Sequence, residues 1–219
     1  FLNCDMSGIT IPESVKEIGE RAFCSCRYLT NIKIPRDITV IENETFRSCD
    51  SLKSIIIPDR VTTIGEEAFA YCQSLVDITI SDSVTVIGKN AFHGCAMESI
   101  RIPKNVKIIE GNPAPQCYSL QSFTVDNDNH YYTVEDDILY NIDKTDLIAY
   151  PIAKQSSSIV IPDSVTSIGY RAFYVCKNLI NITIPDSVTT IGEEAFIDCA
   201  KLKKIMIPNS VTTIGCGAF

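Results

Sequence analysis

Tryptophan is absent from the sequence, and histidine and methionine are scarce, with two and three residues among 219. A large aromatic side chain at a binding surface must therefore be tyrosine or phenylalanine. No apolar run approaches the roughly 18 residues that a membrane-spanning helix needs, and no basic-then-apolar leader opens the chain. We therefore expect no direct membrane insertion of this stretch.

Basic residues are outnumbered by acidic ones, 19 against 27, so the formal net charge is −8 and the sequence pI is about 4.8. A negative surface repels phosphate backbones and anionic lipid, which argues against a nucleic-acid partner. Hydrophobic residues make up 45% of the chain and charged residues 21%, as in ordinary soluble domains, so we expect a real core.

A repeat of 23 residues organises the sequence, and its most visible mark is the dipeptide Ile-Pro. The dipeptides begin at Ile11, Ile34, Ile57, Ile102, Ile161, Ile184 and Ile207, and Ile80 stands in the same series before a serine. The spacing is one residue shorter between Ile80 and Ile102, and it is much longer between Val125 and Ile161. Internal repetition of this length is typical of solenoids, whose coils each need a neighbour to bury their apolar face.

Two short strands are expected in each coil. Leu75, Ile78 and Ile80 alternate with polar residues toward the end of one unit, which predicts a strand that is buried on one side. Pro58, which follows such a strand, lacks an N–H group and ends the ladder. The β-branched run 61–64 favours a second strand on the opposite side of the coil.

A corner follows the second strand. We expect Gly65 to supply the positive φ of a tight turn, and Phe69 to return a ring to the interior after Ala68. The predicted fold is a leucine-rich-repeat solenoid, mainly β with turn or 3-10 corners. It is a right-handed stack of parallel coils with one β-hairpin insertion.

The unit Ile-Pro-x-x-Val-Thr-x-Ile-Gly-x-x-Ala-Phe-x-x-Cys-x-x-Leu-x-x-Ile resembles the BspA-like leucine-rich repeats of surface proteins from host-associated bacteria and some protist parasites. The resemblance covers nearly the whole chain. It implies a non-enzymatic protein-binding or adhesion module of a cell-surface or secreted protein, extracellular in location, with a host extracellular or surface protein as the partner. The alternative is an intracellular or periplasmic scaffold built on the same repeat, which reduced cysteines would favour.

The chain divides into N-terminal coils (1–125), a hairpin insertion (126–158) and C-terminal coils (159–219). Just before the insertion, the segment 111–115 replaces the usual Ala-Phe corner and places Ala114 where a phenylalanine belongs, which predicts a local change in curvature. Within the insertion, apolar segments flank the polar stretch 141–146, a pattern typical of a hairpin. Asp137 stands where similar proteins carry glycine, and aspartate tolerates the left-handed conformation.

The ten cysteines do not have the spacing of a disulfide scaffold. Eight occupy the same place in successive coils, namely Cys4, Cys26, Cys49, Cys72, Cys95, Cys117, Cys176 and Cys199. We expect buried free thiols there, because side chains on stacked coils point in parallel and sulfur packs well in an apolar column. Cys24 and Cys216 lie outside this ladder.

Metal and catalytic sites are not predicted. A single Cys-x-Cys at Cys24 is a poor zinc signal. The acidic run 126–137 has the length of a calcium loop, but Tyr131 stands where that loop needs glycine. The repeat brings together no nucleophile, base and orienting acid, so the sequence predicts no cofactor, no metal and no enzymatic activity.

Two surfaces are candidates for binding a protein partner. The outward row of the strand stack is mostly small and polar, which suits an extended contact but equally suits plain solubility; it includes Lys33, Thr79, Arg101 and Thr124. The insertion holds a concentration of tyrosines, at Tyr131, Tyr132, Tyr140 and Tyr150. These rings are expected to carry the specific contact, or else to build a private core under the hairpin. If both Tyr131 and Tyr132 are buried, the insertion has a structural role only and does not bind a partner.

The two ends of the sequence have the phase of a repeat corner. Phe1 lies three residues before Cys4, and Phe219 has the same phase in the last unit. Both ends are therefore expected to cut through a coil, with more coils or a polar cap on at least one side.

Overall fold

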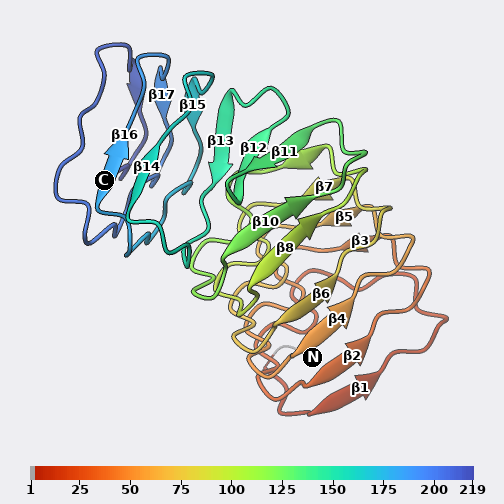
Figure 1. The fold of residues 1–219 in the computed structure, drawn as a ribbon. Coiled ribbons are helices and arrows are strands. Elements are labelled where there is room, and N and C mark those ends of the chain that lie inside the picture. The colour runs from red at the N-terminus through yellow and green to blue at the C-terminus, as the bar shows by residue number, and fades with distance from the viewer. Residues whose placement is uncertain (1–2) are drawn as a thin grey trace.

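A computed structural model describes residues 3–219, so the expectation for Phe1 lies outside the described residues. The described chain is a parallel β-solenoid of strands β1 to β18 and contains no helix between residues 3 and 219. Figure 1 shows the coils stacked along one axis in the N-terminal part, and a second stack that runs in a different direction near the C-terminus. The predicted leucine-rich-repeat solenoid is confirmed.

The first strand of each coil builds one long side of the solenoid, which we call the strand face. Its strands are β1 (Gly8–Thr10), β2 (Asn31–Lys33), β4 (Ser54–Ile56), β6 (Asp77–Thr79), β8 (Ser99–Ile102), β10 (Ser122–Val125), β14 (Ser158–Val160) and β16 (Asn181–Thr183). Parallel pairs join the same repeat positions, as Ile9 joins Ile32 and Ile55 joins Ile78. In β2 and β4, the central isoleucine points inward and its two neighbours point outward, which gives the predicted alternation.

A second column of two-residue strands runs along the opposite side of the coils. It consists of β3 (Val40–Ile41), β5 (Thr63–Ile64), β7 (Val86–Ile87) and β9 (Ile108–Ile109), and, after the insertion, β15 (Ser167–Ile168), β17 (Thr190–Ile191) and β18 (Thr213–Ile214). All pair in parallel with their neighbours in each group. The second strand predicted from the β-branched run is therefore present.

The glycine after this second strand has a different role from the one expected. Gly65 does not have a positive φ; the left-handed residue of the corner is Glu67, with φ 51°. What excludes a side chain at Gly65 is the preceding coil, because a Cβ there would lie 2.6 Å from the Oδ1 atom of Asn43 and 2.8 Å from its backbone nitrogen. The expectation of a positive φ is wrong, and close approach of two coils explains the glycine.

The interior is organised in columns. The corner rings of Phe23, Phe46 and Phe69 stack with centroids 5.5 and 5.3 Å apart. Beside them, five of the ladder thiols donate a hydrogen bond to a carbonyl oxygen of the preceding coil, as Cys72 Sγ does to Phe46 O at 3.1 Å. Cys49, Cys95, Cys117 and Cys199 repeat this contact with the preceding coil's corner residue. All eight ladder cysteines are reduced thiols, as predicted, and six of them are buried, but Cys4 and Cys199 are only partly buried.

The insertion is a three-stranded antiparallel meander of β11 (Tyr132–Glu135), β12 (Ile138–Asn141) and β13 (Asp146–Ala149). The β12–β13 hairpin is the predicted one, while β11 was not predicted. Asp136 and Asp137 form the two-residue turn between β11 and β12 with φ values of 49° and 63°, so both occupy the left-handed region that a type I′ turn requires.

The meander is part of the solenoid and forms a wedge between its two stacks. Strand β13 pairs in parallel with β15, so it leads the second column of the C-terminal coils. On the corner side no strand intervenes, and Asn112 Nδ2 donates directly to Arg171 O at 2.9 Å. Extra strands on one side and direct contact on the other bend the stack, in agreement with the different directions of the two stacks in Figure 1.

Side chains of the meander serve both cores. Leu139 and Ile148 pack with the N-terminal coils, whereas Tyr140 and Leu147 pack with the C-terminal coils. Tyr150 takes the corner-ring place of the missing phenylalanine and lies 5.2 Å from the Phe173 ring. The insertion thus connects the apolar core of the N-terminal coils, in which Ala114 replaces the last corner ring, with the apolar core of the C-terminal coils.

Candidate functional site on the strand face

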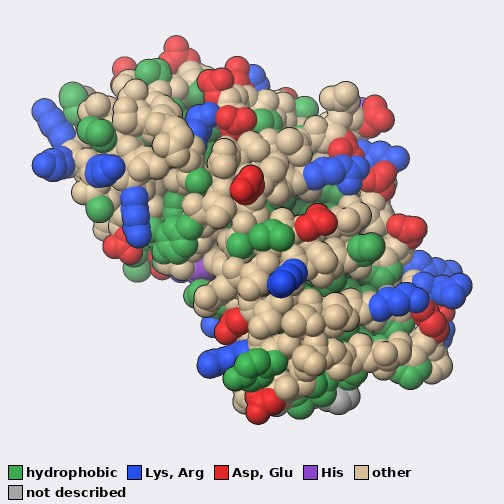
Figure 2. Space-filling model, turned by 60° about the horizontal axis from the view of Figure 1, so that its bottom comes forward, with side chains coloured by type: hydrophobic (Ala, Val, Ile, Leu, Met, Phe, Trp, Pro, Cys, Tyr) green, Lys and Arg blue, Asp and Glu red, His purple; other side chains and the backbone are tan. Residues whose placement is uncertain are grey.

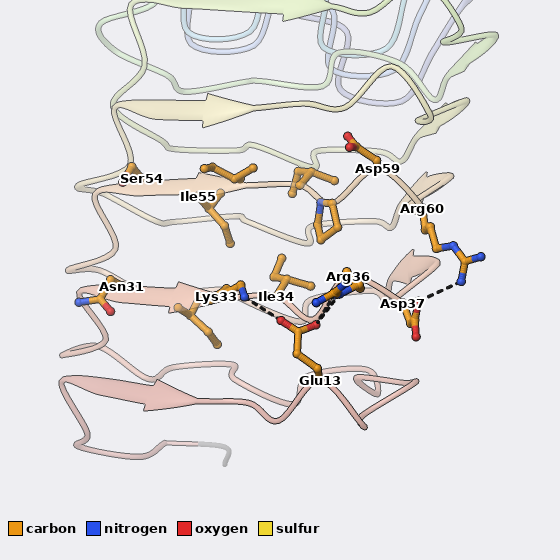
Figure 3. A pocket seen from close by; sticks show the side chains of 14 residues that line it. Glu13, Asn31, Lys33, Ile34, Arg36, Asp37, Ser54, Ile55, Asp59 and Arg60 are labelled. Carbon is orange, nitrogen blue, oxygen red and sulfur yellow. Dashed lines mark hydrogen bonds and ion pairs between the residues drawn. The ribbon is translucent and has the colours of Figure 1, made fainter.

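A hollow of about 830 Å³ opens on the strand face between β2 and β4. It follows one of the breaks in the strand pairing, which we call a seam: among the described strands β2 pairs only with β1 and β4 only with β6, and a further break separates β6 from β8. Figure 3 shows that the side chains around the hollow come from three successive coils. Its lining includes Lys33, Ile34, Arg36, Ile56, Pro58 and Arg60. We call this site the seam hollow.

The floor of the seam hollow is apolar. Ile34 and Ile57 are buried, whereas Ile56 on the outward side of β4 is 70% exposed. An isoleucine that points to solvent on a strand gains nothing from the core, and most other members of its row, including Thr79 and Thr124, are polar. The exposed side chain therefore offers apolar area for contact with another molecule.

The rim of the seam hollow is charged, and its acids are paired locally. Glu13 accepts hydrogen bonds from Lys33 Nζ at 2.7 Å and from the backbone nitrogen of Arg36 at 3.0 Å. The bond from Lys33 is the main reason that the pKa of Glu13 is lowered to about 2. Asp37 binds Lys16 and Arg60, and its pKa is lowered chiefly by the bond from Lys16.

These ion pairs leave the cations accessible on the outer side. The side chains of Lys33, Arg36 and Arg60 are 84%, 79% and 67% exposed, so each keeps N–H donors toward solvent. An apolar floor inside a rim of donors matches the anatomy of protein-binding surfaces, in which a polar rim encloses an apolar centre.

The four strand-face residues predicted from the sequence all point outward, and the structure places them in one row on strands β2, β6, β8 and β10. Lys33 lines the seam hollow. Arg101 is engaged in the fold, because its Nε donates to Asp126 and its Nη2 donates to Asp82, each at 2.8 Å. Replacement of Arg101 by glutamate would disturb the coils themselves, which makes Lys33 the better probe of binding.

The four tyrosines of the insertion do not form one surface. Tyr132, Tyr140 and Tyr150 are buried, and only Tyr131 is exposed, by 42%. The hydroxyl of Tyr132 accepts a hydrogen bond from Ile109 N at 2.8 Å and donates to Lys107 O at 3.2 Å. This burial does not fit a contact made by all four rings, because three of them fill the wedge. Tyr131 alone remains available to a partner.

Sequence reasoning missed the seam hollow as a unit. Lys33 was predicted to point outward, but Glu13, Arg36 and Arg60 lie in the turns after the strands and were not singled out. The available signal was the charge in these turns combined with an apolar residue, Ile56, in a row whose members are mostly polar. The interruption of the ladder between β2 and β4 has no counterpart in the repeat pattern.

The sequence of this chain matches the family model of the BspA type leucine rich repeat region in six copies, over residues 1–121, 39–155 and 152–219. This chain belongs to the BspA-type leucine-rich repeat family. No curated protein matches it.

Solved structures of other repeat proteins share the fold. The pneumococcal vaccine antigen PcpA is 27% identical with a TM-score of 0.83, over 95% of this chain and 58% of that protein. A leucine-rich repeat protein of Eubacterium ventriosum is 28% identical with a TM-score of 0.75, over 95% and 62%. A leucine rich cell surface protein of Faecalibacterium prausnitzii is 29% identical with a TM-score of 0.75, over 98% and 70%. The chain thus spans less than two thirds of the first two structures.

Two thiols of the cysteine ladder have raised pKa values. Burial raises the pKa of the Cys117 thiol to about 12 and that of Cys72 well above its usual value, so both stay protonated and unreactive. Residues 3–219 contain no group of three or more His, Cys, Asp or Glu side chains placed to hold a metal ion. In the same residues, no helix is long and apolar enough to cross a membrane.

Proposed function

We propose that this chain is a non-enzymatic protein-binding or adhesion module of a cell-surface or secreted protein, and that its strand face makes the contact. The observation that carries the proposal is the seam hollow, where an exposed isoleucine lies inside a rim of exposed cations. Repeats of this family are in general scaffolds rather than enzymes. Two proteins of similar structure, a vaccine antigen and a cell surface protein, support the location.

The test compares two exposed isoleucines on opposite sides of the coils. Ile56 on β4 is 70% exposed and Ile108 on β9 is 51% exposed. The purified chain is titrated against a panel of immobilised extracellular and cell-surface proteins, and the dissociation constant for each ligand is measured again for Ile56→Asp and Ile108→Asp. Burial of an isoleucine contributes about 1.5–3 kcal/mol, so we expect Ile56→Asp to weaken binding by roughly 10- to 100-fold.

Ile108→Asp serves as the matched control and should leave the affinity unchanged. Equal losses in both variants would argue against the strand face, and so would a loss confined to Ile108→Asp. Both substitutions add one charge to an exposed β-strand residue, so circular dichroism should show that both variants keep the fold.

The alternative function is an intracellular or periplasmic scaffold, and the buried thiols favour it. Thiols such as those of Cys72 and Cys95 are free in the structure, as expected in a reducing compartment. Antibody staining of intact and permeabilised source cells separates the two locations. Staining of intact cells supports the surface protein, and staining only after permeabilisation supports the scaffold.

A further inference from the structure

Three lysines of the last coil stand apart from the rest of the charge on this chain. Lys201, Lys203 and Lys204 are exposed, and none of them forms an ion pair within residues 3–219. Elsewhere the basic side chains are largely neutralised, as Lys33 is by Glu13 and Arg171 is by Glu194. Figure 2 shows blue side chains gathered at the end of the molecule where the C-terminal coils lie. An acidic chain thus carries an unpaired basic patch.

The patch lies at the beginning of the strand face in the last coil. In the repeat, Lys203 and Lys204 correspond to Lys53 and Ser54, the outward positions just before and at the start of a strand. The lysines line a second hollow, of about 420 Å³, together with Asn181 and Ile180. Their long side chains therefore surround a depression rather than a flat surface.

Exposed apolar side chains lie within the same patch. Ile180 in the wall of the hollow is 47% exposed, and Met206, two residues beyond Lys204, is 75% exposed. Neither side chain contributes much to the core, so both offer apolar area beside the ammonium groups. We call Ile180, Lys201, Lys203, Lys204 and Met206 the lysine patch.

We propose that the lysine patch binds a short acidic segment of a protein partner that also carries an apolar side chain. The ammonium groups would pair with Asp or Glu carboxylates, and the partner's apolar side chain would cover Ile180 and Met206. A sulfated polysaccharide would use the lysines but would leave the two apolar side chains uncovered. Moreover, a long polyanion would extend over the surrounding surface of a chain with a net charge of −8, which repels it.

The experiment measures binding of a fluorescent peptide of alternating glutamate and leucine to the full chain by anisotropy at low and physiological salt. The triple variant Lys201→Gln, Lys203→Gln, Lys204→Gln should weaken binding at least about fivefold, because each exposed pair contributes a modest amount and the effects combine. Ile180→Ser should weaken it as well. Added salt should reduce the affinity of the wild type more than that of the triple variant.

Matched controls keep the outcomes distinct. Lys53→Gln changes a lysine at the same repeat position as Lys203 that also lacks an ion pair, and it should leave peptide binding unchanged. A peptide in which glutamine replaces glutamate should not bind. Ile56→Asp should also leave peptide binding unchanged. The proposal for the seam hollow and the proposal for the lysine patch can therefore fail independently of each other.

Two results would overturn the proposal. One is equal binding of the acidic peptide by the wild type and the triple variant. The other is binding of a sulfated polysaccharide in the absence of any binding of the peptide, which would assign the patch to a carbohydrate ligand. Because all three lysines are exposed, the triple variant should keep the circular dichroism spectrum of the wild type.

Discussion

Replacement of Gly88 by alanine tests the close contact between adjacent coils. A Cβ at Gly88 would lie 2.6 Å from Glu66 N and 2.6 Å from Gly65 C. Both atoms belong to the backbone of the preceding coil, so neither can move aside as a flexible side chain would. Overpacking of a well-packed interior costs about 1–3 kcal/mol, and we expect Gly88→Ala to destabilise the chain by the upper part of that range.

Gly19 provides the matched control because it occupies the same place in the first coil. A Cβ there would meet no atom within 4 Å, and Gly19 does not have a positive φ. In a purified fragment of residues 1–219, Gly19→Ala should therefore be neutral, or stabilising by about 0.4–1 kcal/mol through the lower entropy of the unfolded chain. Both variants are compared with the wild type by urea unfolding followed by circular dichroism.

The two explanations of the repeat glycine give different results in this pair. If close approach of coils explains the glycine, only Gly88→Ala is destabilised. If the corner instead needed a conformation that alanine cannot adopt, both variants would lose stability equally, and our reasoning would be refuted. A Gly88→Ala variant as stable as the wild type would refute it too.

Three further predictions concern the wedge and the cysteine ladder. Asn112 Nδ2 donates to Arg171 O and its Oδ1 accepts from Ala114 N, so Asn112→Ala should cost about 1–3 kcal/mol in urea unfolding; an unchanged midpoint would show that this corner contact does not hold the two stacks together. Asp136 has φ 49°, so Asp136→Gly should be neutral or stabilising and Asp136→Val should cost about 1–2 kcal/mol, and equal thermal midpoints would contradict the type I′ turn. Burial raises the pKa of Cys117 from 9.0 to about 12, so the contribution of this thiol to stability is complete below pH 9 and is lost as the pH rises toward 12. The difference in unfolding free energy between the wild type and Cys117→Ala should therefore shrink between pH 8 and pH 10. A difference that stays constant over this range would contradict the burial.

The coil architecture could be predicted from the sequence because each position repeats under the same physical demand. The inward strand position of Ile78 and the corner position of Phe69 recur in the other coils. An ambiguous residue in one coil can therefore be interpreted from its equivalents in the others. The glycine was interpreted wrongly for the opposite reason. Gly65 is consistent with a positive φ and with close packing alike, and only the position of Asn43 in the adjacent coil separates the two.

The insertion was predicted less completely because it occurs once. Strand β11 begins at Tyr132 within a polar stretch and gave no clear alternation, so the third strand was missed. The tyrosines gave an ambiguous signal, since Tyr140 in a core and Tyr131 at a surface are the same residue type. Which ring is buried depends on the pairing of β13 with β15. Strand β13 belongs to the insertion and β15 to a repeat coil, so no common sequence pattern predicts that they pair.

Hydroxyl-radical footprinting of the complex with a protein ligand found in the binding panel tests the central claim, that the strand face is the binding surface, most directly. The method reports which exposed side chains lose access to solvent when the partner binds. We predict protection of Ile56 together with the neighbouring seam hollow, while Ile108 and Tyr131 stay as reactive as in the free chain. Protection of Tyr131 or Ile108 with Ile56 still fully reactive would contradict the account and move the contact to the insertion or to the opposite side of the coils.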